Sequence, residues 1–134
     1  MELGNLNAMR DWGHAQDYVE AMYLMLQSKV PNDYVVATGE THSVREFCDV
    51  SFSLIGMPLT WKGEGVEEVG VDQKGIVRVK VNPKYFRPTE VDFLLGDSTL
   101  VRKDLGWKPK LTFKDLAEDM VKADVDLMKK DPNA

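Results

Sequence analysis

Cysteine and histidine are nearly absent from this sequence, and their scarcity limits the sites it can form. The only cysteine, Cys48, has no second thiol with which to form an intramolecular disulfide, and the two histidines, His14 and His42, lie far apart in the chain. A structural zinc ion needs about four cysteine or histidine ligands, usually in closely spaced pairs. We therefore expect neither a disulfide framework nor a metal site, and we interpret Cys48 as a small buried hydrophobe rather than a nucleophile.

An excess of positive charge and long apolar runs are also lacking. Lysine and arginine number 17 against 22 aspartates and glutamates, which gives a formal net charge of -5. Proteins that bind nucleic acid cluster basic residues on one face, whereas the basic residues here are scattered among acids. No stretch approaches the roughly 18 apolar residues of a membrane span, and residues 1–13 lack the layout of a secretory signal. We expect a cytoplasmic protein with no nucleic-acid partner and no membrane contact.

The residues that are present predict one small α/β domain spanning 1–134. Hydrophobic residues make up 43% of the chain, which is enough to bury a core. Helical spacing and alternation predict about four helices with short strands. Expected helices cover residues 14–27, 44–55, 98–105 and 113 onward, and expected strands cover 3–6, 34–38, 59–61 and 76–81. The glycine-rich and acidic segment 62–75 is expected to be a mobile loop.

Polar residues and glycine mark the expected ends of the helices. Ser43 and Glu46 have the S-x-x-E form of a capping box, in which each side chain accepts from the other residue's backbone amide. Asp97 and Thr112 are the expected N-caps of the two later helices, and Gly106 is an expected stop. The large side chains expected to pack in the core are Trp12, Met22, Met25, Trp107, Met120 and Met128.

Several motifs of nucleotide chemistry are missing. The sequence has no glycine-rich G-x-G-x-x-G or G-x-x-G-x-x-G turn, no phosphate-binding G-x-x-x-x-G-K and no Tyr-x-x-x-Lys pair. The chain therefore lacks the parts that would hold a dinucleotide and move a proton, and we assign no catalytic residue within it.

Two arginines stand in positions suited to a phosphorylated ligand. Arg10 comes just before the first long helix, and Arg87 is followed by Pro88, which restricts the backbone. A guanidinium presents a planar fork of donors that matches phosphate oxygens two at a time, so the pair could hold a diphosphate. Glu90, on the same segment, could accept from both hydroxyls of a ribose. From spacing alone, a structural salt bridge is the simpler interpretation of each arginine.

Three longer segments resemble the C-terminal portion of the extended short-chain dehydrogenase/reductase family of nucleotide-sugar enzymes. They are RDWGHAQDYVEAM at 10–22, YVVATGETHSVREF at 34–47 and NPKYFRPTEVDFLLGDSTLVRKDLGWKPK at 82–110. In that family an R-D-[WY]-x-x-[HV]-x-D segment opens a helix, an R-P-x-[DE] segment follows, and a segment ending in L-G-W-x-P comes near the end. The similarity covers nearly the whole chain and is closest to the branch that dehydrates GDP-mannose.

The resemblance implies that this chain is the smaller, C-terminal substrate-binding domain of a two-domain enzyme. An N-terminal Rossmann domain would bind NADP and carry the catalytic tyrosine, lysine, threonine or serine, and glutamate. The chain is expected to begin after those residues, so the Rossmann half is absent and the chain alone is inactive. The implied reaction oxidises C4 of the mannose, eliminates water across C5 and C6 and returns the hydride to C6. Its product is GDP-4-keto-6-deoxymannose, on the way to GDP-fucose.

The resemblance also implies roles for single residues. Arg10 and Arg87 would bind the diphosphate of GDP-mannose, and Glu90 would bind its ribose. Asn5 is a further candidate for substrate binding, although an asparagine beside a glycine is typical of a turn. His14 and Asp17 match the helix-opening motif. We interpret both as structural, because an aspartate in the first turn is favoured by the helix dipole.

Two alternatives remain open. An epimerase or decarboxylase of the same family would share Arg10, Arg87 and Glu90, and a non-catalytic binding or assembly module belongs to a different class altogether. The parent enzyme is expected to be a homo-oligomer. The chain alone is expected to self-associate through the apolar surface that the Rossmann domain would cover.

Overall fold

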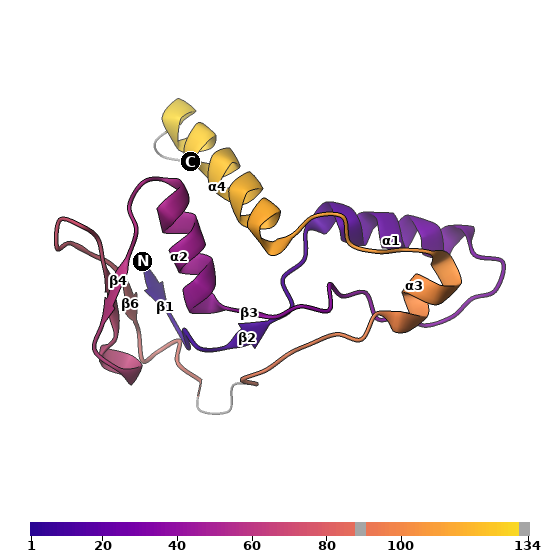
Figure 1. Ribbon diagram of the computed structural model, residues 1–134, viewed down its shortest axis with the longest axis horizontal. Coiled ribbons are helices and arrows are strands. Elements are labelled where there is room, and N and C mark those ends of the chain that lie inside the picture. The colour runs from indigo at the N-terminus through magenta and orange to yellow at the C-terminus, as the bar shows by residue number, and fades with distance from the viewer. Residues whose placement is uncertain (88–90, 132–134) are drawn as a thin grey trace.

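The computed structural model describes residues 1–87 and 91–131, which form an α/β structure with two separate cores (Figure 1). The helices are α1 (Ala15–Gln27), α2 (Val44–Leu54), α3 (Thr99–Leu105) and α4 (Phe113–Lys130), with a short 3-10 helix, η1, at Gly65–Glu67. The strands are β1 (Glu2–Leu3), β2 (Met9–Arg10), β3 (His42–Ser43), β4 (Thr60–Lys62), β5 (Val69–Val71) and β6 (Val77–Val81). The predicted fold class is confirmed.

A four-stranded sheet and α2 form one end of the molecule (Figure 1). The strand order is β1-β6-β5-β4, with β1 parallel to β6 and the other pairs antiparallel. The alternation predicted for residues 76–81 holds at Val79 and Val81, which are buried, while Lys80 between them is exposed. Together with Leu6 and Cys48 from α2, these two valines form the first core.

The second core lies at the other end of the molecule, where α1, α3 and Trp107 pack together. Trp107 is almost fully buried there against Ala21 and Val101, as predicted for a core tryptophan. Its indole Nε1 donates to the backbone oxygen of Asp17 at 2.8 Å. The Asp17 carboxylate, also buried, accepts from the backbone amides of residues 110 and 111, each at 3.0 Å. The structural interpretation of Asp17 is confirmed, because it joins the start of α1 to the segment between α3 and α4.

The helix ends follow local capping chemistry, with two departures from prediction. Thr112 and Asp115 form a complete capping box at α4. At α2, Ser43 Oγ accepts from the Glu46 amide at 3.0 Å, but the Glu46 carboxylate lies 2.9 Å from His42 Nδ1, so the reciprocal half of the predicted box is not made. The N-cap of α3 is Ser98 and not Asp97, whose Oδ1 accepts from the Thr99 amide. The predicted stop at Gly106 is confirmed, since its φ of 67° is left-handed.

Two predictions of strand and loop are wrong. Residues 34–38 are not a strand, because the amide of Thr38 donates to the Asp11 side chain and the segment pairs with no described strand. The expected loop 62–75 contains η1 and β5, which pairs with both β4 and β6. Gly70 within β5 packs closely on Trp61, since a Cβ there would lie 3.0 Å from the indole ring. The first predicted strand, 3–6, is shorter than expected and shifted to Glu2–Leu3.

The predicted burial of methionine is also largely wrong. Met25 packs against the second core, but Met22, Met120 and Met128 are 60%, 46% and 45% exposed. They lie on faces of α1 and α4 that the described part of the chain leaves uncovered. None of the described helices has the length and apolar character that crossing a membrane requires.

Candidate functional site

The segment that follows Arg87 in the chain runs along β2. Met9 forms a parallel bridge with Phe93, in which the Met9 amide donates to the Asp92 oxygen at 2.7 Å and the Leu94 amide donates to the Met9 oxygen at 3.1 Å. On its other side β2 pairs with β3, with Arg10 opposite His42. Residues from three distant parts of the sequence therefore lie side by side in this region (Figure 1).

Arg10 contributes a further contact to the same segment. Its Nη1 donates to the Met9 oxygen at 2.8 Å and to the Val91 oxygen at 2.6 Å. Because a planar guanidinium that donates to two fixed carbonyls loses much of its freedom, these bonds hold the direction of the side chain. Arg10 thus joins β2 to residue 91, next to the R-P-x-E segment that the sequence singled out.

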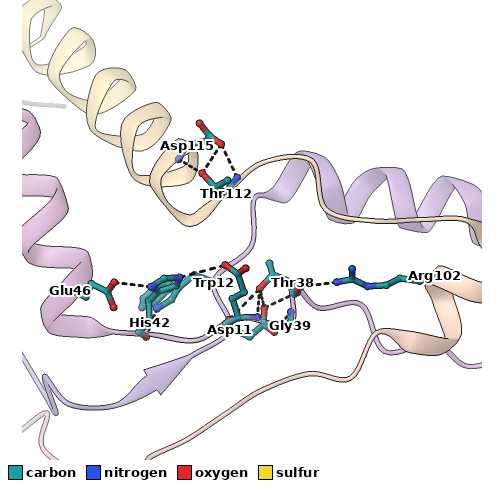
Figure 2. A network of polar contacts seen from close by, with 10 residues as sticks. Asp11, Trp12, Thr38, Gly39, His42, Glu46, Arg102, Thr112 and Asp115 are labelled. Carbon is teal, nitrogen blue, oxygen red and sulfur yellow. Dashed lines mark hydrogen bonds and ion pairs between the residues drawn. The ribbon is translucent and has the colours of Figure 1, made fainter.

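Asp11 accepts hydrogen bonds from three chain positions at once, of which Figure 2 shows Thr38 and Gly39. Oδ1 accepts from the Thr38 amide at 2.8 Å and the Thr38 hydroxyl at 2.6 Å, and Oδ2 accepts from the Gly39 amide at 3.0 Å and the Gly96 amide at 3.4 Å. Burial alone would raise the pKa of Asp11, but the bonds from Thr38, Gly39 and Gly96 together hold it below its ordinary value. Asp11 is therefore ionised at neutral pH.

A cavity of about 320 Å³ opens beside these two residues. Its walls combine the polar pair with a tyrosine and apolar backbone segments: Arg10, Asp11, Tyr18, Val35, Val36, Ala37, Leu94, Leu95 and Gly96. The wall at 96 requires glycine, because a Cβ there would lie 2.2 Å from the Ala37 Cβ. Burial, and then the charges of Asp11 and Asp17, raise the pKa of Tyr18. The cavity can accept an apolar or flat group with an anion held at the arginine.

The predicted site residues divide between this region and the loop after β6. Asn5 Oδ1 accepts from the Asn7 amide at 2.9 Å, as in a turn, and its Nδ2 donates to Asp92 at 3.3 Å. Arg87 is exposed and makes no hydrogen bond or ion pair among the residues the structure describes. Glu90 lies outside the described residues, as does Pro88. The structure therefore brings Arg10 and Asn5 to the segment that follows Arg87 and Glu90.

Three residues that sequence reasoning missed hold this region together. Asp11 was overlooked beside Arg10, and Thr38 was placed at the end of a strand. Arg102 Nη2 donates to the Thr38 oxygen at 2.8 Å, and its Nε donates to Ser98 Oγ at 2.9 Å. The sequence feature that could have indicated this contact is the threonine–glycine pair at 38 and 39. It follows an apolar run, and its two backbone amides can donate to a carboxylate.

Aromatic packing accounts for Trp12. Its ring stacks on Phe47 at 5.0 Å between centroids, and its Nε1 donates to the His42 oxygen at 2.9 Å. His42 in turn stacks on Phe113 at 4.0 Å. Trp12 thus joins α2 to the start of α4, in agreement with its predicted packing role.

Neither the histidines nor the cysteine forms a reactive site among the described residues. No group of three or more histidine, cysteine, aspartate or glutamate side chains is arranged there to hold a metal ion. His14 Nδ1 accepts from the Gln16 amide and so caps α1, as its structural interpretation predicted. Burial raises the pKa of the Cys48 thiol to about 11, so it is protonated at neutral pH.

Comparison with known proteins identifies the family. A protein-family model described as GDP-mannose 4,6 dehydratase matches residues 1–120. The chain belongs to the GDP-mannose 4,6-dehydratase family. The GDP-mannose 4,6 dehydratases of Drosophila melanogaster and Homo sapiens are 62% and 57% identical to it, over 99% and 98% of the chain. The chain spans only 34% and 36% of those relatives, about a third of their length.

A solved structure of a different nucleotide-sugar enzyme shares the fold of this dehydratase-family chain. It is the dTDP-glucose 4,6-dehydratase of Bacillus anthracis in complex with NAD, with a TM-score of 0.69 at 16% identity. The match covers 96% of this chain and 35% of that one. At this identity the likeness is one of fold, and it places the chain's architecture among those enzymes.

Proposed function

We propose that this chain supplies the nucleotide-sugar-binding part of a GDP-mannose 4,6-dehydratase. The family match over residues 1–120 supports the proposal, as do relatives of that name at 62% and 57% identity. The geometric observation that carries it is the placement of Arg87. This arginine is exposed, has no polar partner among the described residues, and stands four positions before Val91, where the segment that β2 and Arg10 hold begins.

In this proposal the diphosphate of GDP-mannose binds to Arg87 and Arg10, with Glu90 on the ribose. A guanidinium with no polar partner among the described residues can give its whole fork of donors to phosphate oxygens, so Arg87 suits the role of main ligand. Arg10 uses Nη1 for two carbonyls, which fixes the guanidinium plane at the edge of the cavity. Asn5 is then a turn residue that also supports the segment through Asp92.

The residues present do not form a site for NADP. The sequence has no glycine-rich turn between a strand and a helix, which is the element that accepts a dinucleotide pyrophosphate. In the proposal the cofactor is bound by the rest of the protein; the Bacillus anthracis dehydratase that shares the fold was solved in complex with NAD. The conversion of GDP-mannose to GDP-4-keto-6-deoxymannose then belongs to the whole protein, which we propose to be a cytoplasmic homo-oligomer. This chain, as a single substrate-binding domain over 1–134, is inactive alone.

Calorimetric titration of the folded chain with GDP-mannose, and separately with UDP-glucose, tests the proposal. Binding of GDP-mannose alone supports it and places the choice of base in this part of the protein. Preference for UDP-glucose would indicate another nucleotide-sugar enzyme with the same fold. If neither ligand binds to a chain that melts cooperatively, the chain does not form a nucleotide-sugar site by itself, and the alternative of an assembly module gains support.

A further inference from the structure

Asp11 lies where three chain segments meet, beside the cavity that Arg10 lines. It is the residue after Arg10, and its carboxylate accepts from Thr38 and Gly39 (Figure 2). It also accepts from the Gly96 amide. Thr38 and Gly39 directly follow the wall segment 35–37, and Gly96 belongs to the wall segment 94–96. A single side chain therefore joins the strand that carries Arg10 to both walls.

Three consecutive residues of the chain hold the segment 91–96 at successive points. Met9 bonds to residues 92 and 94, Arg10 bonds to the oxygen of Val91, and Asp11 accepts from the Gly96 amide. Bonds at four positions within six residues fix the path of a segment that has no regular secondary structure. Of these four contacts, the one at Gly96 lies furthest along the segment, and it alone depends on a carboxylate.

Arg102 extends the same network into α3. It donates to the Thr38 oxygen and to Ser98 Oγ, so that Thr38 receives support on one side from Asp11 and on the other from α3. Ser98, two residues beyond Gly96, is buried. The far end of the 91–98 segment is therefore held through Thr38, whose own position depends on Asp11.

We propose that Asp11 is a positioning residue for nucleotide-sugar binding, which acts through Arg10 and the 94–96 wall rather than by contact with the ligand. The inference rests on the proposed function, and it assigns a role to Asp11, for which the resemblance implied none. An asparagine at this position can still accept from Thr38 through Oδ1. Its Nδ2, however, is a donor and would face the amides of Gly39 and Gly96, which are also donors, so those two hydrogen bonds would be lost.

Asp11→Asn, with Asp17→Asn as the matched control, tests the inference in the folded chain. Asp17 also accepts from two backbone amides, but it holds α1 to residues 110 and 111, away from the 91–96 segment. The measurements are the affinity for GDP-mannose, the melting temperature, and the NMR signals of the Arg10 side chain and the Gly96 amide. We expect Asp11→Asn to weaken binding on the order of tenfold and to shift both signals. Asp17→Asn should lower the melting temperature and leave binding and both signals unchanged.

A second pair of variants keeps the test decisive if Asp11→Asn fails to fold. Thr38→Val removes the hydroxyl that donates to Asp11, and Thr38→Ser retains it, so only the valine variant should reproduce the loss of affinity and the shifted signals. Unchanged signals in Asp11→Asn, or equal changes in Asp17→Asn, would overturn the positioning role. If the folded wild-type chain does not bind GDP-mannose, the proposed function fails. The Arg10 and Gly96 signals alone then decide whether Asp11 positions the cavity.

Discussion

Arg87 is the residue at which the proposed function makes its most specific prediction. Its side chain is exposed and makes no polar contact among the described residues, so we expect its charge to contribute little to the stability of the fold. We expect Arg87→Ala to weaken binding of GDP-mannose by about 2 kcal/mol, because a charged donor is lost from a bound anion. The melting temperature should stay close to that of the wild type. Calorimetry and thermal melts of the same preparation measure both.

Arg78→Ala is the matched control for that substitution. Arg78 Nε donates to Asp72 Oδ2 at 2.7 Å, so the control removes an arginine that does have a structural partner. It should lower the melting temperature without affecting the affinity for GDP-mannose. If Arg87→Ala binds GDP-mannose as tightly as the wild type does, Arg87 is not a diphosphate ligand.

The lowered pKa of Asp11 predicts how stability depends on pH. Burial favours the protonated form, but the bonds from Thr38, Gly39 and Gly96 outweigh it and hold the pKa below its ordinary value of 3.8. A carboxylate whose pKa is lowered by folding contributes stability that is fully present above the unfolded pKa and is lost as pH falls through the folded one. The stability from Asp11 should therefore be complete near neutral pH and disappear below about pH 4.

Thermal melts of the wild type and Asp11→Asn across this range measure the effect. The melting temperatures should differ near pH 7 and converge as the pH falls below about 4. The wild type will keep part of its acid sensitivity elsewhere, because four other carboxylates among the described residues also have lowered pKa values: Glu2, Asp72, Asp97 and Asp115. A difference that stays constant from neutral to acid pH would show that the charge of Asp11 is not what stabilises the fold.

At the scale of an element, the N-terminus of α4 gives a direct test of capping. Thr112 Oγ1 accepts from the Asp115 amide at 3.2 Å, and Asp115 Oδ2 accepts from the Thr112 amide at 2.8 Å. Thr112→Ala should lower the free energy of unfolding by about 1 kcal/mol. Thr112→Ser keeps the hydroxyl and should unfold close to the wild type in urea. Equal losses in both variants would assign the effect to the methyl group instead of the cap.

The helices were predictable from the sequence because their signals are local. The helical spacing of residues 15–27 and the cap residues at 43, 106 and 112 each act within a few positions of the chain, and all four helices formed close to where they were expected. Strands depend on partners that the sequence does not identify. Residues 34–38 have the composition of a strand but pair with no strand among the described residues. Val69–Val71 lies in an acidic segment that does not suggest a strand, yet it pairs with two neighbouring strands.

The candidate site was predictable in part, for the same reason. The chemistry of an arginine is a property of the residue, so Arg10 and Arg87 could be selected from the sequence together with Glu90. That Arg10 donates to the backbone at residue 91 depends on β2 lying along the 91–94 segment, which is a contact across 81 positions. Asp11 was missed because its role needs Thr38 and Gly96 to come together in space.

At the scale of the whole molecule, the outer face of α1 is the main unexplained surface. Val19, Met22, Tyr23 and Leu26 lie on one side of this helix and are more than half exposed, and Leu26 reaches 82%. Apolar patches of this kind usually mark a contact surface. Because relatives at 62% and 57% identity are about three times as long as this chain, we propose that further sequence covers the face in the complete protein.

We expect the chain alone to self-associate through this face, and sedimentation measures whether it does. Burying an exposed leucine side chain contributes roughly 2 kcal/mol, so two copies joined through this face remove several such side chains from water. Leu26→Glu places a charge in the patch and should shift the chain toward monomer. Gln27→Glu introduces the same charge at the next residue, which is exposed and polar, and should leave the association unchanged. If both variants associate as the wild type does, the contact lies elsewhere, and the exposed residues of α4, among them Met120 and Leu127, become the surface to substitute next.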